Sequence, residues 1–343
     1  MKKSRIRIVF RADGNSHIGL GHIYRCIAMV QMLKYEFNCL FIINNPDENI
    51  SDLIRGNCLL HTINVQSKEE EITALDNILT PSDIVVTDGY DFGPEYQMQL
   101  KQRVKKLVMI DDMADMHFFA DVVINHGSES MASKYKTEKG TKLLVGFDYL
   151  VLRQEFLEAA RKHRTVYKAN NAFICMGGSD PFKITTKALK ACIETPFIER
   201  ITVITGSGYQ DRSALDLLIK TNTNKSIVHK YNIDAPAMVG LINECEIAIC
   251  PSSTIALEVC CVHTGLLSGT VADNQEAIHR QIVDADCCLS AGNLIKASIP
   301  SLTNTLRQFA DVNLIRTMMT RQAEKIDGQS GKRIADLFRQ LAI

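Results

Sequence analysis

The fold of this chain is decided near its start by the segment Ile6-Arg7-Ile8-Val9-Phe10 and by the later segment Ile18-Gly19-Leu20-Gly21-His22-Ile23-Tyr24-Arg25-Cys26. The first segment is typical of a short buried strand, and apolar residues recur at helical spacing from Ile23 to Leu33. A strand, a glycine loop and a helix form a phosphate-binding frame, because amides at a helix N-terminus point at the anion. His22 stands where the helix is expected to begin, so this segment combines an anion site with a base.

The composition favours a protein with two ordinary domains and a small-molecule substrate. The chain has 343 residues, 46% of them hydrophobic, and its formal net charge is zero. These values argue against disorder and against a nucleic-acid-binding surface. No run approaches the roughly 18 apolar residues of a membrane span, and Met1-Lys2-Lys3-Ser4-Arg5 leads directly into a strand. We expect a cytoplasmic protein; the composition indicates no oligomeric state.

The cysteines and histidines do not form the patterns typical of disulfides or of metal sites. Many of the 11 cysteines lie inside apolar runs, as Cys175 and Cys250 do, and the adjacent pairs Cys260-Cys261 and Cys287-Cys288 cannot easily bridge internally. We therefore expect reduced core thiols. No two cysteines have a zinc-knuckle gap and the nine histidines are scattered, so we expect neither a metal nor a cofactor.

Strand-like apolar runs alternate with helical stretches along the chain, which predicts parallel sheets covered by helices. In the first half these runs cover residues 6–10, 39–43, 83–87, 106–110 and 121–124. In the second half they cover residues 172–176, 201–205, 226–229, 247–250 and 264–267. Past Ser301 only helical patterns occur.

A polar, basic stretch at 155–170 separates the two series of strands, and we place the domain boundary there. The predicted domains are 1–165 and 166–343, the second with trailing helices. Two such α/β domains usually leave a cleft between them, and ligands of open α/β sheets bind outside the carboxyl ends of the strands.

The glycine loop does not match a dinucleotide-binding fingerprint. Tyr24 occupies the third glycine position, about eight residues separate the loop from its strand, and the second strand ends in Asn44-Asn45 without a ribose-binding acid. Gly19 and Gly21 would instead permit close approach of the backbone to a diphosphate or a sugar. His22, at the positive end of a helix, would be a neutral imidazole able to act as a general base. A purely capping or packing role for His22 is equally compatible with the spacing.

Two strand-to-helix turns in the second half are further candidates for anion sites. The first is Gly177-Gly178-Ser179-Asp180, which is either an anion cradle or an ordinary turn with Ser179 or Asp180 as the N-cap. The second is Pro251-Ser252-Ser253-Thr254, with Glu258 one helical turn beyond. Its hydroxyls and amides suit phosphate oxygens and Glu258 suits a ribose diol, whereas the alternative is an N-cap with a solvated glutamate.

Three shorter features also follow predicted strands. Asn274 and Gln275 open a helix, and their amides could bind a sugar. Asp88-Gly89-Tyr90 and Ile110-Asp111-Asp112 close strands of the first half, where turn-forming aspartates are commoner than substrate-binding ones.

Taken together, these motifs resemble the PseG family, the UDP-2,4-diacetamido-2,4,6-trideoxy-β-L-altropyranose hydrolases of pseudaminic acid biosynthesis. The resemblance runs in order from about residue 6 to the C-terminal Asp327-Gly328 segment. Its pieces are the Arg-Ala-Asp and Gly-x-Gly-His-x-x-Arg-Cys motifs, Asp88-x-Tyr90, the segments at 110–115 and 149–156, the Gly-Gly-Ser-Asp-Pro turn and Ala-Asp-Asn-Gln.

The resemblance implies a GT-B fold like that of MurG, with two Rossmann-like α/β domains facing each other across a cleft. It implies metal-independent hydrolysis of a UDP-linked amino sugar, with UDP held by the second domain and water attacking the anomeric carbon. His22 would be the base, and Tyr90 and Asn274 would assist at the sugar. The implied substrate- and UDP-binding residues are Arg11, Asp13, Gly19, Gly21, Gly178, Ser179, Met238, Ser253, Thr254, Glu258 and Gln275.

Two other functions use the same residues. A MurG-like glycosyltransferase would pass the sugar to an acceptor alcohol, but the sequence has no clear membrane-docking patch in its first half. A catalytically silent sugar-nucleotide-binding protein would not need His22, Tyr90 and Asn274 together.

Overall fold

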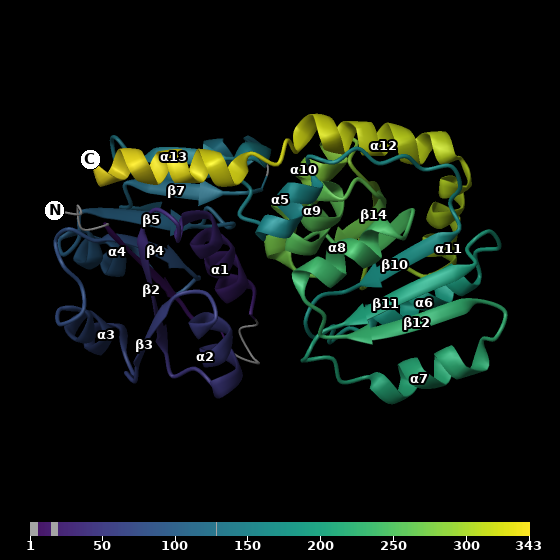
Figure 1. The fold of residues 1–343 in the computed structure, drawn as a ribbon, viewed down its shortest axis with the longest axis horizontal. Helices are drawn as coiled ribbons and strands as arrows, with labels where there is room; N and C mark the ends of the chain where they lie inside the picture. Colours follow the sequence, from purple (N-terminus) through teal and green to yellow (C-terminus); the bar gives the residue numbers. More distant parts are fainter. Residues whose placement is uncertain (1–5, 15–19, 128) are drawn as a thin grey trace. The chain divides into compact units, whose positions relative to one another are not determined.

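Two parallel β-sheets, one in each of two units, organise the chain (Figure 1). The structure, a computed structural model, describes residues 6–14, 20–127 and 129–343. Unit 1 comprises Met1–Gln154 and Gln329–Ile343, and unit 2 comprises Glu155–Gly328. Each unit is an α/β fold of the Rossmann type.

Unit 1 is built on a seven-stranded parallel sheet with the order β3-β2-β1-β4-β5-β7-β9. The strands are β1 (Arg7–Ala12), β2 (Asn38–Asn44), β3 (Leu59–Ile63), β4 (Ile84–Asp88), β5 (Lys106–Ile110), β7 (Val122–Asn125) and β9 (Lys142–Val145). A separate pair joins β6 (His117–Phe118) to β8 (Lys136–Thr137).

Both faces of the unit 1 sheet are buried, which explains the apolar runs Ile8-Val9-Phe10 in β1 and Ile84-Val85-Val86 in β4. In β1, Ile8 and Phe10 belong to the core on the side of α1 and α13, whereas Val9 belongs to the core on the side of α3 and α4. Successive side chains of a strand point to opposite faces, so one apolar strand serves both cores. The helices of unit 1 are α1 (Gly21–Leu33), α2 (Glu48–Arg55), α3 (Lys68–Leu75), α4 (Pro94–Lys101) and α13 (Ser330–Ala342).

Unit 2 is built on a six-stranded parallel sheet with the order β12-β11-β10-β13-β14-β15. The strands are β10 (Asn171–Cys175), β11 (Arg200–Thr205), β12 (Ser226–Tyr231), β13 (Ile247–Pro251), β14 (Gly265–Thr270) and β15 (Leu289–Asn293).

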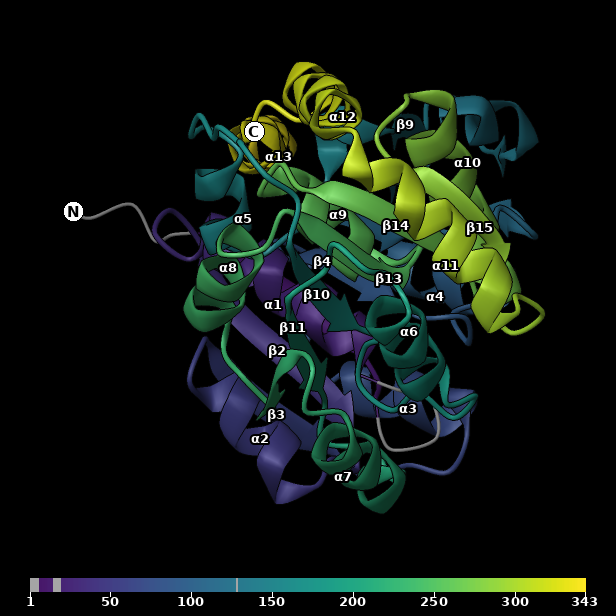
Figure 2. The same ribbon diagram turned by 90° about the vertical axis from the view of Figure 1, so that its right-hand side faces the viewer.

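Helices follow the strands of unit 2, and α6 and α11 pack side by side (Figure 2). Within α12, the buried Gln322 donates hydrogen bonds to the carbonyl oxygens of Thr264 and Cys287, which holds this helix against the sheet. The helices are α5 (Gln154–Ala159), α6 (Ile184–Ile193), α7 (Arg212–Thr221), α8 (Ala235–Asn243), α9 (Thr254–Cys261), α10 (Glu276–Asp284), α11 (Ile299–Arg307) and α12 (Val312–Lys325).

The ten strands predicted from apolar runs are all present, with bounds that differ by a few residues. Five strands of the described residues were not predicted. The strands β6 and β8 have only two residues each. The strands β3, β9 and β15 lie at edges of their sheets, so they lack the continuous apolar run of a strand with two buried faces. In β3, for example, only Ile63 is buried.

The domain division differs from the predicted boundary at both ends. The first crossing lies at Gln154 rather than at 165, because residues 155–165 pack with unit 2. The assignment of all of 166–343 to the second domain was wrong for Gln329–Ile343, since the chain returns to unit 1 at Gln329. There α13 buries Ile334 and Phe338 in the core beside α1, and it lies with unit 1 in Figure 1.

Among the described residues, no helix is long and apolar enough to cross a membrane. Ten of the 11 cysteines are buried, as predicted for core thiols, and Cys58 is the half-buried exception.

Each sheet has one point at which its strand order reverses. In unit 1 the reversal lies between β1 and β4, and in unit 2 it lies between β10 and β13. Connections leave in opposite directions from such neighbouring strands, which opens a crevice at their carboxyl ends where ligands bind in this class of fold. The candidate residues after β1, β4, β10 and β13 therefore lie where a ligand is expected in each unit.

Candidate functional site

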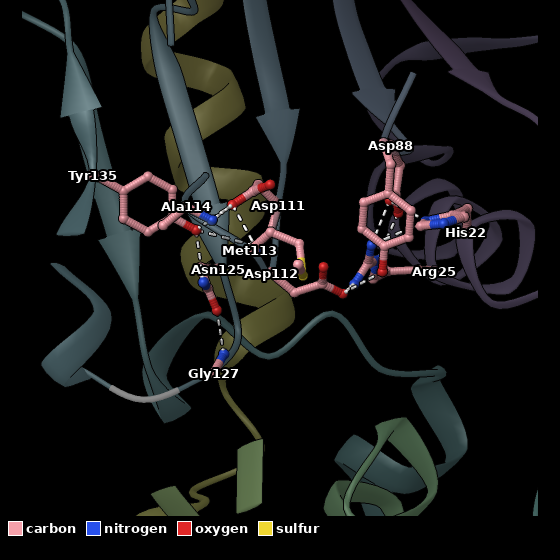
Figure 3. A network of polar contacts seen from close by, with 11 residues as sticks. His22, Arg25, Asp88, Asp111, Asp112, Met113, Ala114, Asn125, Gly127 and Tyr135 are labelled. Carbon is pink, nitrogen blue, oxygen red and sulfur yellow. Dashed lines mark hydrogen bonds and ion pairs between the residues drawn. The ribbon is translucent and has the colours of Figure 1, made fainter. Parts of the chain in front are cut away.

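In unit 1 a buried carboxylate at the end of β4 meets two side chains of α1 (Figure 3). His22 and Arg25 lie three residues apart, which places both on one face of the helix. Asp88 is the last residue of β4, next to β1 in the sheet, so the strand-order reversal brings the three side chains together.

The Asp88 carboxylate is fully buried and binds both side chains of α1. Its Oδ1 lies 2.8 Å from His22 Nδ1 and 2.5 Å from Arg25 Nη2, and its Oδ2 accepts a hydrogen bond from Arg25 Nε at 2.6 Å. An ionised carboxylate only accepts, so the proton of the neutral imidazole sits on Nδ1 and Nε2 has the free lone pair. This is how an aspartate orients a histidine that acts as a base.

The ion pair keeps both buried charges in place. Burial by itself would raise the pKa of Asp88, but the charge and hydrogen bonds of Arg25, with the bond from His22, lower that pKa below its ordinary value. Burial would likewise lower the pKa of Arg25, but Asp88 and Asp112 raise it. Asp88 is therefore an anion and Arg25 a cation throughout the neutral range.

Tyr90 and Asp112 extend this cluster toward solvent. The Tyr90 ring meets the His22 ring edge to face, with 4.9 Å between centroids, and Tyr90 is 46% exposed. Its hydroxyl is 3.4 Å from Asp112 Oδ2, to which Arg25 Nη1 donates at 3.1 Å. The Tyr90 phenol is thus open to solvent, whereas the His22 ring beside it is only 8% exposed.

A second polar cluster lies at the ends of β5 and β7 (Figure 3). Asp111 Oδ2 accepts hydrogen bonds from the Tyr135 hydroxyl at 2.7 Å and from the amides of Met113 and Ala114. Asn125 donates to the Tyr135 hydroxyl at 2.7 Å. Asp111 is thus the predicted turn-forming aspartate, and burial raises its pKa. Asp88, for which the turn interpretation was also favoured, makes side-chain bonds to α1 instead.

His126 directly follows β7 and is buried. Its Nδ1 has no hydrogen-bond partner among the described residues. Burial, and then the charge of Arg25, lower its pKa to about 4, so the ring is neutral near pH 7.

Arg11 and Asp13 form a network within unit 1. Arg11 is 1% exposed and donates to Glu71 from one side and to Asp13 from the other, at 2.6 to 2.9 Å. Two carboxylates of unit 1 thus surround the Arg11 guanidinium, and contact between Arg11 and a ligand stays a prediction. Asp13 also accepts from the Asn44 amide, and Arg11 holds it at the end of β1.

The glycine loop is described only at its end. Gly19 lies outside the described residues, as does His17. Gly21 is the first residue of α1, so the helix begins one residue before His22. A Cβ built on Gly21 would meet no atom within 4 Å, which leaves open space above this turn in the described part of the chain.

In unit 2 the turn after β13 presents the start of α9. Ser253 is the N-cap residue and its side chain makes no capping hydrogen bond. Thr254 is the first residue of the helix, and both residues are half-buried. Glu258, predicted on the same face one turn later, is only 4% exposed, so it is not the solvated glutamate of the alternative interpretation. The helix start has the hydroxyls and the uncapped amides that a phosphate needs.

The turn after β10 differs from the predicted anion cradle in one respect. The Asp180 carboxylate accepts hydrogen bonds from the amides of Ile184 and Thr185, at 2.8 and 2.7 Å. The N-cap residue of α6 is Lys183, so neither Ser179 nor Asp180 holds the predicted N-cap position. The Asp180 carboxylate nevertheless satisfies the first two amides of the helix, which are therefore not available to a ligand. Gly178 accepts a bond from the Gly208 amide, which ties this turn to the loop after β11.

The other predicted residues of unit 2 lie apart from these turns in the sequence. Asn274 and Gln275 lie in a short 3₁₀ turn after β14, where Gln275 Oε1 accepts from the Val271 amide. Met238 lies in α8 and is 8% exposed, so its side chain contributes to packing.

Sequence reasoning missed three side chains of the unit 1 cluster in the roles that the structure gives them: Arg25, Asp88 and Asp112. The signal for Arg25 was present, since it lies one helical turn after His22 on the same face. No pattern of spacing links Asp88 to His22, because 66 residues separate them. Among the described residues, no group of three or more His, Cys, Asp or Glu side chains could hold a metal ion.

Curated proteins of similar sequence include two with named roles. A UDP-2,4-diacetamido-2,4,6-trideoxy-β-L-altropyranose hydrolase from Campylobacter jejuni is 26% identical over 79% of this chain and 94% of its own length. The spore coat polysaccharide biosynthesis protein SpsG from Bacillus subtilis is 22% identical over 82% of each chain. An uncharacterised protein from Methanocaldococcus jannaschii is 27% identical over 67% of this chain, and the match spans about half (49%) of that relative. No family model matches the sequence.

Solved structures show what the fold is. MurG from Acinetobacter baumannii superimposes with a TM-score of 0.71 at 14% identity, covering 98% of this chain and 99% of MurG. The Arabidopsis thaliana glycosyltransferase UGT89C1, solved with UDP-L-rhamnose, gives a TM-score of 0.67 at 11% identity, covering 99% and 100%. The protein therefore has the GT-B fold of the MurG-like glycosyltransferases, and its sequence resembles the PseG hydrolases.

Proposed function

We propose that the protein is an enzyme that acts on a UDP-sugar and hydrolyses it to UDP and the free sugar. The observation that carries the proposal is the pairing of His22 with the buried Asp88, which leaves the imidazole Nε2 as a base beside the exposed Tyr90. The relatives that process UDP-sugars or polysaccharides supply the substrate class.

The chemistry divides between the two units. In unit 1, His22 Nε2 would take a proton from water as the water oxygen forms a bond to the anomeric carbon. The bond from that carbon to the UDP oxygen breaks, and the electron pair stays on the diphosphate. In unit 2, Ser253, Thr254 and the uncapped amides of α9 would bind this developing negative charge.

The remaining predicted residues have supporting roles in this proposal. Glu258 would bind the ribose, and Gly21, Gly178 and Ser179 would lie against the nucleotide sugar. Asn274 and Gln275 would bind the sugar through side-chain amides, which both donate and accept hydrogen bonds. Tyr90 would contact the sugar next to His22.

The proposed substrate is UDP-2,4-diacetamido-2,4,6-trideoxy-β-L-altropyranose, the substrate named for the Campylobacter jejuni relative. Hydrolysis would release 2,4-diacetamido-2,4,6-trideoxy-L-altrose, as in pseudaminic acid biosynthesis. The main support is the similarity to this relative, which is 26% identical over 279 residues.

The test is to incubate the purified protein with this nucleotide sugar in water enriched in oxygen-18, with EDTA and without an acceptor. We expect UDP and free sugar, with the label in the sugar. Label in the nucleotide, or the products UMP and sugar phosphate, would contradict attack at the anomeric carbon.

The fold similarity to MurG supports one alternative, a glycosyltransferase that uses the same donor. This alternative predicts that UDP appears only when an acceptor alcohol is added. Release of UDP at the same rate with and without acceptors would exclude it.

A further inference from the structure

A continuous series of hydrogen bonds connects the surface of unit 2 to the main chain of β13, the strand before α9. His279 Nε2 lies 2.9 Å from the hydroxyl of the exposed Ser290, and His279 Nδ1 lies 2.7 Å from the Ser252 hydroxyl. The Ser252 hydroxyl is 2.8 Å from that of Ser268, which donates to the Cys250 carbonyl oxygen at 2.9 Å. Ser252 and Ser268 are fully buried, so their hydroxyls bond to protein groups rather than to bulk water.

The carbonyl group at the inner end of this series of hydrogen bonds determines which group donates in each bond. Because Ser268 donates to the carbonyl of Cys250, it accepts the bond from Ser252. The only hydroxyl proton of Ser252 is then used, so Ser252 accepts from His279 Nδ1. In the neutral ring, Nε2 therefore accepts from the Ser290 hydroxyl.

When His279 is protonated, every hydrogen bond of this series can still form. A proton added at Nε2 makes it a donor, and the Ser290 hydroxyl has only to turn its own proton toward solvent. Ser290 Oγ also accepts from the Gly292 amide at 3.1 Å, and its two lone pairs serve both donors. The bond from Nδ1 to Ser252 is the same in both protonation states.

The surroundings of His279 nevertheless disfavour the charged ring. Burial lowers its pKa below the ordinary value, against the raising effect of Glu276 in the same helix. The strands β13, β14 and β15, which supply its hydrogen-bond partners, contain no charged residue. A further negative charge close to Ser252 would therefore favour uptake of a proton.

The start of α9 is where such a charge is expected. Ser252 directly precedes Ser253, the N-cap residue of α9. We propose that His279 is a positioning residue of the nucleotide site, holding the turn before α9 through Ser252 and taking up a proton as the diphosphate binds. This inference rests on the proposed function, since it assumes that the anion bound at α9 is the diphosphate of UDP.

The test measures proton uptake when UDP binds to the full-length protein. Calorimetric titrations just below neutral pH, in two buffers of different ionisation enthalpy, give the number of protons taken up per UDP. His279→Asn is the informative variant, because its Nδ2 occupies the place of Nδ1 and can still donate to Ser252 but cannot titrate. His279→Gln is a second variant in case the first does not fold.

A matched control is His229→Gln. His229 lies in β12, is also partly buried, and bonds Thr205 through Nε2, but three steps across the sheet separate β12 from β13. Its pKa is also lowered by burial. Titration of UDP itself contributes equally to all of these proteins, so it cancels in the differences.

We expect the wild type and His229→Gln to take up more protons per UDP than His279→Asn does. As the pH falls below neutral, we also expect the UDP affinity of the wild type to increase about three- to tenfold more than that of His279→Asn. This is the size expected for one partly screened charge interaction. His279→Ala should in addition weaken UDP binding above neutral pH, and His279→Asn should restore it. Equal proton uptake by the wild type and His279→Asn would overturn the inference alone. Absence of UDP binding to the wild type would overturn the proposed function and, with it, this inference.

Discussion

The Asp88 carboxylate binds two side chains of α1, and these two interactions have different effects. It fixes the proton of His22 on Nδ1, and it neutralises the buried Arg25. In the proposed mechanism the first effect serves catalysis, and the second stabilises the fold, so substitutions at His22 and at Asp88 separate them.

At His22, replacement by Asn should remove activity while leaving the fold intact. The Asn side chain can still donate to Asp88 in place of Nδ1, but it has no group at Nε2. We expect kcat for release of UDP to fall about 10²- to 10⁴-fold, as for loss of a general base, with UDP affinity unchanged. The control is His117→Asn, whose exposed ring bonds Glu138 at the surface of unit 1. Wild-type turnover in His22→Asn would place the base elsewhere.

At Asp88, replacement by Asn should destabilise unit 1, because the buried Arg25 loses its closest charged partner and keeps only the longer ion pair with Asp112. We expect a loss of about 3–5 kcal/mol in the free energy of unfolding in urea. The matched control, Asp76→Asn, breaks the more exposed pair with Arg103 and should cost less than about 1 kcal/mol.

The effect of Asp88→Asn should also depend on pH. The pKa of Asp88 is lowered in the folded protein, so its contribution is complete above the unfolded pKa of about 4 and is lost as the pH falls through the folded value. Unfolding measured from neutral pH downward should therefore show the difference between wild type and variant shrinking only below about pH 4. A constant difference down to still lower pH would mean that Asp88 contributes by shape rather than by charge.

At the scale of elements, the loops after β10 and β11 in unit 2 approach each other closely. A glycine in the second loop makes this approach possible. A Cβ on Gly206, after β11, would lie 2.6 Å from Gly178 Cα and 2.7 Å from its carbonyl oxygen. The loop after β11 therefore packs directly against the Gly177-Gly178 turn.

Gly206→Ala should displace the Gly178 turn. We expect a loss of about 1–3 kcal/mol in the free energy of unfolding, as for overpacking, together with weaker UDP binding. Gly240→Ala is the matched control, because Gly240 lies inside α8 and its Cβ would meet nothing within 4 Å. That change should stabilise unit 2 by about 0.5–1 kcal/mol. Unchanged stability and UDP affinity in Gly206→Ala would show that the turn is free to shift.

At the scale of the whole molecule, the chain crosses between its units twice, and its last helix completes the first. Phe338 of α13 is fully buried and packs against Phe37 with 6.4 Å between ring centroids. Arg339 pairs with Glu36, and Lys105 donates to the Ala342 carbonyl oxygen. Unit 1 thus depends on residues that follow all of unit 2 in the sequence.

Phe338→Ala should consequently destabilise unit 1, although it lies more than 300 residues from α1's first turn. We expect a loss of about 3–5 kcal/mol, measured by hydrogen exchange of the unit 1 amides as a function of urea concentration. Phe182→Ala, at a half-exposed phenylalanine of unit 2, should change stability by less than about 0.5 kcal/mol. Loss of stability confined to unit 2 would contradict the assignment of α13.

The sequence by itself determined the fold class, the buried strands and the two turns that open on a helix N-terminus. These follow from local patterns: apolar runs for strands with two covered faces, and hydroxyl or glycine residues where a helix begins. The edge strand β3 could not be predicted in this way, since a strand with exposed side chains lacks the continuous apolar run.

Only the tertiary structure decided which distant side chains meet. His22 and Asp88 come together because β1 and β4 are neighbours in the sheet, and the Asp180 carboxylate rather than a ligand binds the first amides of α6 because of the path of its turn. The apolar face of α13 indicates that the helix is buried, but the same face could pack on either sheet. The physical reason is that hydrophobic patterning states how much surface must be buried and on which face, whereas the choice of partner depends on the arrangement of the whole chain.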